Sequence, residues 1–218
     1  MAVEMIVLPS REAWLENRNK GIGGSEISAV IGCNPYMDNV TLWEIKTGRR
    51  KPADISDKPY VQYGNQAEMH LRGLFRLDFP QLRVDYVDNN SFINSKYPWA
   101  QASLDGWLTD QAGRRGVLEI KTSEIVQAIQ RQRWNNQIPM NYYCQVLFYM
   151  AVIEADFAYV KAQLKTIIED VPYLQTKHYP IELIDAKDDI DYMMEKGEEF
   201  AWHVKKDIRP PLVLPAVL

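Results

Sequence analysis

The spacing of apolar and polar residues predicts several short helices near the start of the chain. Residues 11–21 predict a short helix that turns Trp14 inward and ends at a glycine. Residues 21–32 predict a second helix, with Ser25 as an N-cap candidate after a run of glycines. Residues 40–48 predict a third helix. The polar stretch that follows contains two prolines and is typical of a loop.

A longer helix is predicted over residues 61–79, because its apolar residues recur at helical spacing. Glu68 lies three residues before Leu71 and seven before Phe75, so it shares their face of the helix. The apolar positions in this segment are Met69, Leu71, Leu74 and Phe75. The pattern therefore turns an acid toward the interior.

Strand and helix patterns alternate through the rest of the chain. Apolar runs predict strands at residues 83–87, 91–94, 103–108, 116–121, 157–164 and 176–183. Helices are predicted at 141–153 and 186–206, the second amphipathic, with Ile190, Met193, Met194, Phe200, Ala201 and Val204 mostly on one side. Residues 130–139 indicate a basic, aromatic loop, and the tail is apolar and proline-rich. This order favours one α/β domain over residues 1–218.

Composition narrows the class of protein further. A length of 218 residues suits one α/β domain, and a hydrophobic fraction of 46% supports one sizeable core. No apolar run approaches the ~20 residues of a membrane helix. The first residues lack a basic region followed by an apolar block, so they do not resemble a secretory signal. We expect a cytoplasmic protein without membrane contact.

Cysteine, histidine and charge exclude some kinds of site. Cys33 and Cys144 are the two cysteines and form no Cys-x-x-Cys pair, which excludes a zinc knuckle or a four-cysteine iron–sulfur cluster. A disulfide is disfavoured, in keeping with a reducing compartment. His70, His178 and His203 fit no ligand spacing. A net charge of −4 still permits nucleic-acid binding, because a few arginines in one groove matter more than the total charge.

Two acids interrupt the apolar strands in the middle of the chain. Side chains alternate in a strand, so Glu119 and Lys121 share one face while Leu118 and Ile120 share the other. A turn at residues 109–116 folds the preceding strand back and brings Asp105 opposite Glu119 or one step from it. Two carboxylates this close repel unless a cation lies between them. Mg²⁺ suits the position, because it binds a few carboxylate oxygens and retains several waters. The alternative from spacing alone is a solvated Glu119–Lys121 ion pair and an Asp105 that ends a strand.

Six blocks of sequence together resemble a known family. In order along the chain they are GIGGSEISAVIGCNPY, LWEIKTG, YGNQAEMHLR, ASLDGWL, LEIKT and YYCQVLFYMAV. The acid followed by Glu-x-Lys resembles the PD-(D/E)xK nuclease superfamily. More narrowly, the blocks resemble the YqaJ and lambda-exonuclease family of phage-type recombinases over about residues 11–165. The chain departs from the superfamily pattern at Leu104, where proline is usual. The resemblance implies a PD-(D/E)xK core in which helices flank a central mixed β-sheet, with a C-terminal strand, helix and apolar tail at 166–218.

The resemblance assigns roles to individual residues. Asp105, Glu119, the backbone carbonyl of Ile120 and Glu68 match metal ligands. Lys121 matches the lysine that positions or activates the attacking water, and Gln145 matches a glutamine on the helix beside the sheet. Arg18, Ser25 and Ser103 match residues that, with Gln145, surround the terminal 5′-phosphate. The implied cofactor is Mg²⁺, as two ions, with Mn²⁺ as a substitute.

Four of these assignments have a structural alternative. Glu68 is alternatively a buried acid that caps a loop, and Gln145 a core glutamine whose hydrogen bonds are satisfied. Ser25 is alternatively only an N-cap, although a helix N-terminus also suits a phosphate. Arg18 is alternatively a surface arginine.

Partners and activity follow from the same resemblance. Family members degrade one strand of linear double-stranded DNA in the 5′→3′ direction to 5′-mononucleotides and leave 3′ overhangs for recombination by strand annealing. The resemblance implies a homotrimeric ring on DNA ends and a phage single-strand annealing protein as a partner in a bacterial host. Two basic clusters are expected to contact the duplex, or alternatively to be solvated faces: Arg49, Arg50 and Lys51, and Arg131, Arg133 and Trp134.

Three other functions fit the sequence less well. A structure- or site-specific endonuclease of the same superfamily would cut closed circular DNA, whereas an exonuclease requires an end. A non-catalytic DNA-end-binding protein would not need competent residues at Glu68, Asp105, Glu119 and Lys121. An acidic α/β domain unrelated to nucleic acid fits the composition but leaves the acids unexplained.

Overall fold

A computed structural model describes residues 3–214. Its elements in order are β1 (Val3–Val7), α1 (Arg11–Arg18), β2 (Ile22–Gly23), α2 (Gly24–Val30), α3 (Asn39–Lys46), α4 (Pro59–Asp78), β3 (Arg83–Asp85), β4 (Asn90–Asn94), β5 (Ala100–Ala102), β6 (Gly106–Thr109), β7 (Arg115–Glu124), α5 (Ala128–Arg133), α6 (Met140–Ile153), β8 (Phe157–Ile168), β9 (Val171–Glu182) and α7 (Leu183–Lys206). Within these residues no helix is both long enough and apolar enough to cross a membrane.

Across residues 3–214 the strands form two sheets, which confirms a mixed α/β fold. The larger sheet has the order β3-β6-β7-β8-β9 and the smaller the order β1-β4-β5-β2. In the larger sheet β7 and β8 are parallel and joined by the crossover through α6, whereas the other neighbours are antiparallel. The chain passes from the smaller sheet to the larger between β5 and β6.

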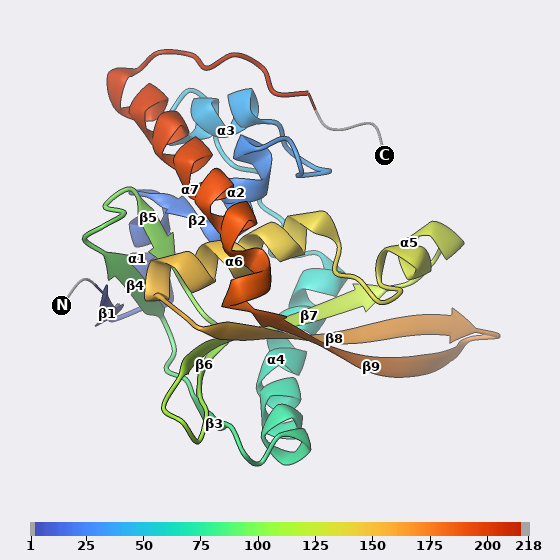
Figure 1. The fold of residues 1–218 in the computed structure, drawn as a ribbon. Coiled ribbons are helices and arrows are strands. Elements are labelled where there is room, and N and C mark those ends of the chain that lie inside the picture. Colours follow the sequence, from blue (N-terminus) through green and yellow to red (C-terminus); the bar gives the residue numbers. More distant parts are fainter. Residues whose placement is uncertain (1–2, 215–218) are drawn as a thin grey trace.

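Helices cover both faces of the larger sheet (Figure 1). On one face α6 packs with α2 and α7 around Val117, Phe148 and Val160, which are fully buried. On the other face α4 packs Leu71 and Phe75 against Leu118. Alternate residues of β7 therefore enter two different cores, as the period of a strand requires. Because both faces are covered, a charged side chain on β7 is buried unless a cleft opens beside it.

Local chemistry explains where several helices begin and end. The side chain of Ser10 accepts from the backbone N–H of Ala13 and caps α1, and Asp38 caps α3 in the same way. A proline in the first turn opens α4. Glu154 takes the left-handed conformation, φ 54°, and ends α6.

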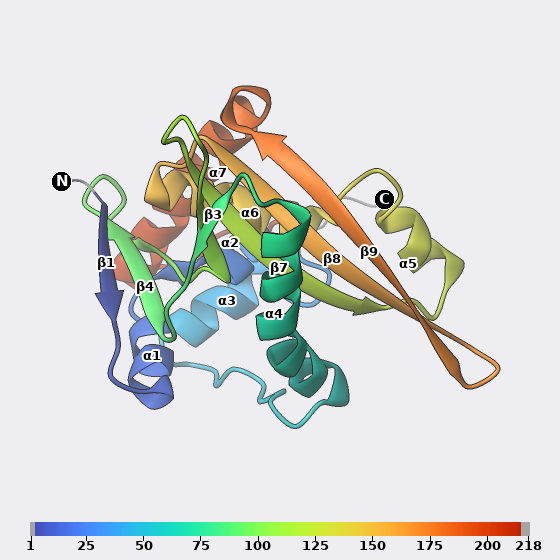
Figure 2. The same ribbon diagram turned by 90° about the horizontal axis from the view of Figure 1, so that it is seen from below.

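Strands β8 and β9 form a hairpin that is longer than the sequence pattern predicts. They are paired from Phe157–Glu182 to Ile168–Val171. Glu169 and Asp170 both have positive φ, 49° and 63°, which suits a two-residue turn between twisted strands. The distal part of this hairpin, residues 165–174, which we call the arm, projects from the body beside α5 (Figure 2). The pattern missed the outer part because its apolar residues, including Ile167, are exposed.

Three predictions about local structure are wrong. The predicted strand 103–108 begins only at Gly106, because residues 103–105 lie between β5, which ends at Ala102, and β6. The predicted loop at 130–139 contains the end of α5. Ser25 lies inside the first turn of α2, and Gly23 is its N-cap.

Burial also corrects two positions of the apolar pattern in α4. Met69 and Leu74 are 64% and 47% exposed, whereas Leu71 and Phe75 are buried. The buried stripe of α4 is therefore narrower than the pattern predicts, and Arg72 rather than a hydrophobic residue completes it.

Candidate active site

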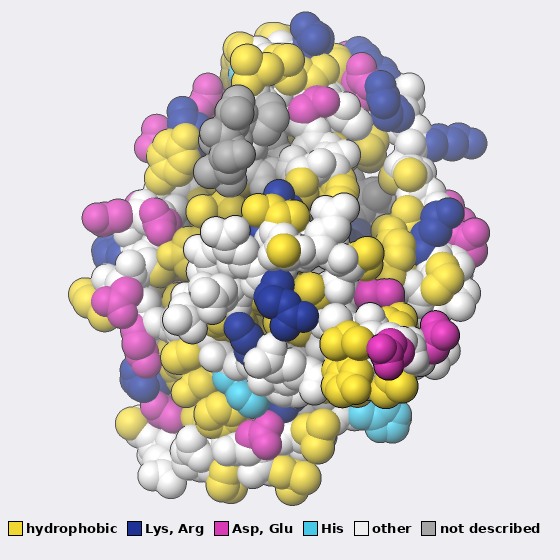
Figure 3. Space-filling view, turned by 90° about the vertical axis from the view of Figure 1, so that its right-hand side faces the viewer, with side chains coloured by type: hydrophobic (Ala, Val, Ile, Leu, Met, Phe, Trp, Pro, Cys, Tyr) yellow, Lys and Arg dark blue, Asp and Glu magenta, His cyan; other side chains and the backbone are white. Residues whose placement is uncertain are grey.

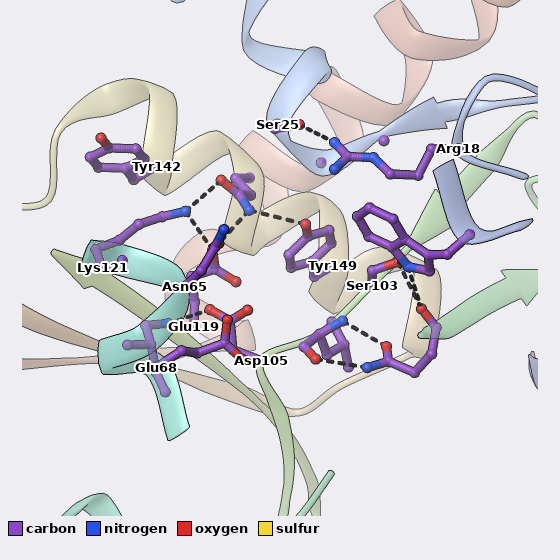
Figure 4. Close-up of a pocket in the computed structure, with 18 of the residues that line it drawn as sticks. Arg18, Ser25, Asn65, Glu68, Ser103, Asp105, Glu119, Lys121, Tyr142 and Tyr149 are labelled. Carbon is purple, nitrogen blue, oxygen red and sulfur yellow. Dashed lines mark hydrogen bonds and ion pairs between the residues drawn. The ribbon is translucent and has the colours of Figure 1, made fainter. Parts of the chain in front are cut away.

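A cleft of about 390 Å³ opens where α1, α2, α4, β7 and α6 meet. The residues predicted from the family resemblance that line it are Arg18, Ser25, Glu68, Ser103, Asp105, Glu119, Ile120, Lys121 and Gln145. Figure 4 shows that the acids lie at one end and Arg18 with Ser25 at the other. The fold thus brings residues as far apart in the sequence as Arg18 and Gln145 into one cleft.

Asp105 lies in the bend between the two sheets and not inside a strand. Its carboxylate oxygen Oδ2 accepts from the backbone N–H of Ile120 at 2.7 Å. Asn90 fixes the preceding residue, because its amide accepts from the N–H of Leu104 at 2.8 Å and donates to the Leu104 carbonyl at 2.9 Å. Burial raises the pKa of Asp105, against the opposing charge of Lys121. The β6–β7 ladder ends at the Gly106–Leu118 pair, so the bend holds Asp105 beside β7 and roughly opposite Glu119, as the sequence predicts.

Glu119 is a nearly inaccessible acid on β7. Only 2% of its surface is exposed, and its Oε1 lies 2.6 Å from the Lys121 ammonium. The amide of Gln145 donates to the same oxygen at 2.8 Å. The other oxygen, Oε2, is buried without a hydrogen-bond partner among the described residues. Burial, followed by the charge of Asp105, raises the pKa of Glu119 to about 8.

Lys121 and Gln145 connect the strand acid to α6. The Lys121 ammonium donates to Gln145 Oε1 at 3.0 Å and lies 4.7 Å from the centre of the Tyr142 ring. Gln145 also donates to the Tyr149 hydroxyl at 3.0 Å. Burial alone would lower the pKa of Lys121, but the carboxylates of Glu119 and Asp105 outweigh it and raise that pKa. Gln145 is therefore a buried glutamine whose partners are two charged groups of the cleft and one tyrosine hydroxyl.

Glu68 reaches the cleft from α4 and is half-buried. Burial, followed by the charge of Asp105, raises its pKa to about 7, while Arg72 opposes the shift. Arg72 lies one helical turn away, donates to Glu68 Oε1, and donates through Nε to the Asp105 carbonyl at 2.5 Å. Its guanidinium carbon is 3.3 Å from the centre of the Tyr86 ring. The α4 acid is thus tied to the bend that carries Asp105.

The opposite end of the cleft is rich in donors and cations. Arg18 donates to the Ser25 hydroxyl at 2.9 Å. The Trp14 indole donates to Ser103 at 3.0 Å, and Ser103 donates to the Asn90 carbonyl at 2.8 Å. The guanidinium carbons of Arg11 and Arg18 lie 4.1 and 4.8 Å from the centre of the Trp14 ring. Two guanidinium groups and two hydroxyls at one end of a cleft favour an anion there.

The two basic clusters predicted to contact the duplex lie outside this cleft. Arg49 pairs with Asp207 at 2.6 Å and Arg50 with Glu44 at 2.7 Å, while Lys51 is exposed. Arg131 donates to Thr166 on β8 at 3.0 Å, and Arg133 is exposed.

Trp134 is not a surface residue, contrary to prediction. It is 2% exposed and stacks on Tyr142 at 5.7 Å between ring centres. Figure 3, which views the face toward which the arm points, shows Lys and Arg side chains interspersed with acidic and apolar ones. That face is therefore not a continuous basic surface.

The sequence reasoning missed four residues that shape the cleft: Arg11, Arg72, Asn90 and Tyr149. A signal for Arg72 existed, since an arginine four residues after a glutamate on a helix lies on the same face. Tyr149 shares its helical face with Gln145 by the same spacing. Asn90 carries no such signal, because its partner at residue 104 is distant in the sequence.

The donor set of the cleft suits a hard divalent cation. Three carboxylates line it together with Ile120, and among the described residues Glu119 Oε2 is buried without a hydrogen-bond partner, so the oxygen donors that such a cation prefers are present. In residues 3–214 no three Asp, Glu, His or Cys side chains are gathered closely enough to hold an ion by themselves. An ion would therefore also need carbonyl or water ligands, which is the usual coordination of Mg²⁺.

The chain is similar to known proteins over most of its length. The family described as YqaJ-like viral recombinase domain matches residues 13–156. The protein YqaJ of Bacillus subtilis (strain 168) is 27% identical over 199 residues, which are 90% of this chain and 56% of that protein. The chain thus spans little more than half the length of this curated relative.

Solved structures share the fold. An alkaline exonuclease from Laribacter hongkongensis has a TM-score of 0.58 at 15% identity, with 90% of this chain and 97% of that chain covered. Its complex with dAMP gives 0.59 with the same identity and coverage. A phage related exonuclease from Haemophilus somnus 129PT has a TM-score of 0.52 at 12% identity, with 86% of this chain and 96% of that chain covered.

Proposed function

Because the chain belongs to the YqaJ-like viral recombinase domain family, we propose that it is a metal-dependent DNA exonuclease. It degrades one strand of linear double-stranded DNA in the 5′→3′ direction, releases 5′-mononucleotides and leaves 3′ overhangs for strand annealing. The observation that carries the proposal is the cleft itself, where Glu68, Asp105 and Glu119 meet Lys121 at one end and cations lie at the other. The solved exonucleases that share the fold support it.

The acids would hold the metal. Asp105, Glu119, Glu68 and the Ile120 carbonyl provide the oxygen ligands for Mg²⁺, as two ions, or for Mn²⁺. When bound, such ions supply positive charge against the phosphoryl oxygens and make water more acidic. The raised pKa of Glu119 suits this role, since a carboxylate that is costly to ionise alone gains most from a cation.

Lys121 acts on the attacking water as a donor. Its raised pKa keeps it an ammonium, which donates hydrogen bonds and accepts none. It can therefore orient a water and stabilise negative charge, but it does not remove a proton. The side-chain amide of Gln145 contacts both Lys121 and Glu119 and so fixes their relative position.

The donor-rich end of the cleft would set the 5′→3′ direction of digestion. Arg18, Ser25 and Ser103, with Gln145, would bind the terminal 5′-phosphate and thereby present the first phosphodiester to the acids. The Ser25 N–H also lies in the first turn of α2, whose dipole favours an anion.

A linear duplex with a 5′-phosphate at one end and a hydroxyl at the other tests the proposal, beside a closed circle. We expect Mg²⁺-dependent loss of the phosphorylated strand, no loss in EDTA, and an intact circle. Arg18→Ala should slow digestion of phosphorylated ends far more than of hydroxyl ends. Nicking of the circle would replace the proposal with an endonuclease, and no cleavage of either substrate would favour a DNA-end-binding protein.

The family also leads us to propose a homotrimeric ring on duplex ends and a phage single-strand annealing protein as partner. In the predicted apolar tail at 212–218, residues 215–218 lie outside the described residues. Light scattering at micromolar protein tests the assembly, and the mass of one chain would reject the ring.

A further inference from the structure

Arg72 is a buried cation that contacts two of the cleft acids with one side chain. It is 6% exposed and stands on α4, one turn after Glu68. Its Nε donates to the backbone carbonyl of Asp105 at 2.5 Å, and a terminal nitrogen donates to the Glu68 carboxylate. The acids come from different elements, a helix and a bend between sheets, so Arg72 links elements that no shared β ladder joins.

The bend that carries Asp105 depends on side chains for its hydrogen bonds. Residues 103–105 lie between β5 and β6 and outside both ladders. A buried carbonyl without a ladder partner must find a donor elsewhere, or its loss of hydration destabilises the fold. Asn90 serves Leu104, and Arg72 serves the Asp105 carbonyl. Of these two side chains, Arg72 also holds a second acid.

The contact requires the geometry of an arginine. A guanidinium is planar and presents donors in a fixed fork, so its two hydrogen bonds set the angle and the distance between their acceptors. The Tyr86 ring lies 3.3 Å from the guanidinium carbon and fixes the plane of the group. A lysine at position 72 would keep the positive charge. Its ammonium is a compact point charge, however, without the planar fork of donors and without a flat group to stack on Tyr86.

We propose that Arg72 is a positioning residue that fixes the separation of the Glu68 carboxylate from Asp105, and that Tyr86 holds its plane. The inference rests on the proposed function, because this separation matters most when both acids act on one divalent cation. Arg72 does not touch the DNA or the reacting atoms in this account. It acts through the two acids.

Arg72→Lys tests the proposal against Arg76→Lys. Arg76 stands one turn further along α4, is exposed, and donates to the Val84 carbonyl at 3.0 Å without contacting either acid. Mn²⁺ affinity is measured by isothermal titration calorimetry without DNA, and kcat and KM are measured on a phosphorylated linear duplex. For Arg72→Lys we expect Mn²⁺ affinity and kcat each to fall by about 10- to 100-fold, the range found when a residue that orients a metal ligand is replaced. KM for DNA should stay within about threefold, and Arg76→Lys should behave as the wild type.

Tyr86→Leu provides a second variant in case Arg72→Lys folds poorly. Tyr86 is only half-buried, and its replacement leaves the charge of Arg72 in place. We expect it to lower Mn²⁺ affinity in the same direction by a smaller factor. The double variant should be no weaker than Arg72→Lys alone, because both changes remove one constraint.

The outcomes separate this inference from the proposed function. An active, Mn²⁺-binding wild type whose Arg72→Lys and Tyr86→Leu variants match Arg76→Lys would overturn the role of Arg72 alone. So would a loss of thermal stability without a change in Mn²⁺ affinity. A wild type that neither binds Mn²⁺ nor degrades DNA would overturn the nuclease and, with it, the positioning role.

Discussion

At the scale of single residues, burial decides what the charged groups of the cleft do. Burial raises the pKa values of Asp105 and of Glu119, and that of Glu68 rises to about 7 for the same reason. Lys121 and Arg72 are the cations that compensate these acids within the chain. A divalent ion in the cleft would have to share or displace these contacts, so the arrangement of the two cations is part of the site.

Lys121→Met should remove the donor that orients the water and leave the DNA-binding end unchanged. We expect kcat to fall by about 10²- to 10³-fold, the loss that follows removal of one oriented donor, with KM changed by less than about threefold. Single-turnover digestion of a phosphorylated duplex measures this. Lys96→Met is the control, because Lys96 is exposed and outside the cleft. A loss confined to KM would contradict the role given to Lys121.

A second group of charges lies at the outer end of α4. Lys161 on β8 is 1% exposed, and its ammonium lies 2.6 Å from Asp78 and 3.2 Å from the His178 ring nitrogen Nε2. His178 also packs edge-on against Phe79. Burial, followed by the charge of Lys161, lowers the pKa of His178. The group ties the part of the β8–β9 hairpin nearest the body to α4, with His178 neutral.

This arrangement predicts how stability depends on pH. Below about pH 6.5 His178 binds a proton in the unfolded chain. In the folded protein its pKa is lower, so it stays neutral to a lower pH. The unfolded state then binds more protons, so the free energy of unfolding falls as pH falls through this range. Asp78, whose pKa is lowered by its hydrogen bond to Lys161, acts with the same sign at lower pH.

His178→Gln should therefore lose less thermal stability than the wild type between about pH 7.5 and 5.5. His70→Gln, at an exposed position of α4, is the matched control and should follow the wild type. Thermal unfolding followed by circular dichroism at both pH values gives the comparison. Parallel decreases in the wild type and the His178 variant would contradict the prediction.

At the scale of elements, the contact of α2 with α6 places Gln145 and Tyr149. A methyl group on Gly24 would lie 2.3 Å from the Tyr149 ring, so only glycine permits this approach. Tyr149 in turn accepts from Gln145. The close packing of α2 on α6 thus fixes Tyr149, and Tyr149 in turn helps to fix Gln145 among the charged groups of the cleft.

Gly24→Ala should destabilise the protein by about 1–3 kcal/mol through overpacking and lower kcat by displacing Tyr149. Gly73→Ala is the matched variant, because it lies in α4 with open space around the added methyl group. That change should stabilise by about 0.5–1 kcal/mol, since glycine weakens a helix interior. Chemical denaturation measures both. Equal effects of the two substitutions would show that the Tyr149 ring does not exclude a side chain at position 24.

Elements whose apolar pattern is continuous are predictable from the sequence, and those held by distant side chains are not. The helices around Trp14 and Gln145 and the strand around Glu119 follow from periodicity. The bend at Asp105 does not, because Asn90 and Arg72 hold it in place of a ladder. The β8–β9 hairpin was predicted too short. Most of its outer residues are exposed, so they lack the alternation of a half-buried strand.

The site divides in the same way. Residue type and spacing suffice to place Glu119 and Lys121 on one face, because alternate residues of a strand share a face. The predicted turn brings Asp105 near them, but distant side chains fix the bend that holds it. The link from Glu68 to Asp105 through Arg72 depends on how α4 crosses the sheet, which no local pattern encodes. Trp134 misled the prediction, because a tryptophan among arginines resembles a DNA-binding surface but packs inward here.

At the scale of the molecule, the basic residues outside the cleft are not equivalent as DNA contacts. Arg49 and Arg50 already pair with carboxylates, whereas Arg131 donates to a hydroxyl and Arg133 is exposed. A cation that must leave an ion pair to meet a phosphate gains less from the exchange.

The double variant Arg131→Ala/Arg133→Ala should weaken duplex binding and reduce the slope of log K against log salt by up to about 2, close to one per lost phosphate contact. Arg49→Ala/Arg50→Ala should change the slope by less. Fluorescence anisotropy across a salt series measures both slopes. A larger change in the Arg49/Arg50 variant would place the duplex against that cluster instead.

Nucleotide release by Asp105→Asn is the sharpest test of whether the cleft acids carry out metal-dependent digestion from a DNA end. The substrate is a linear duplex with one 5′-phosphate, in Mg²⁺ and in EDTA, with the wild type in parallel and folding checked by circular dichroism. We expect release by the wild type in Mg²⁺ alone, and a folded Asp105→Asn protein whose rate is lower by at least about 10³-fold. Release by the folded variant at the wild-type rate, or undiminished release in EDTA, would show that these acids do not drive the digestion through a metal.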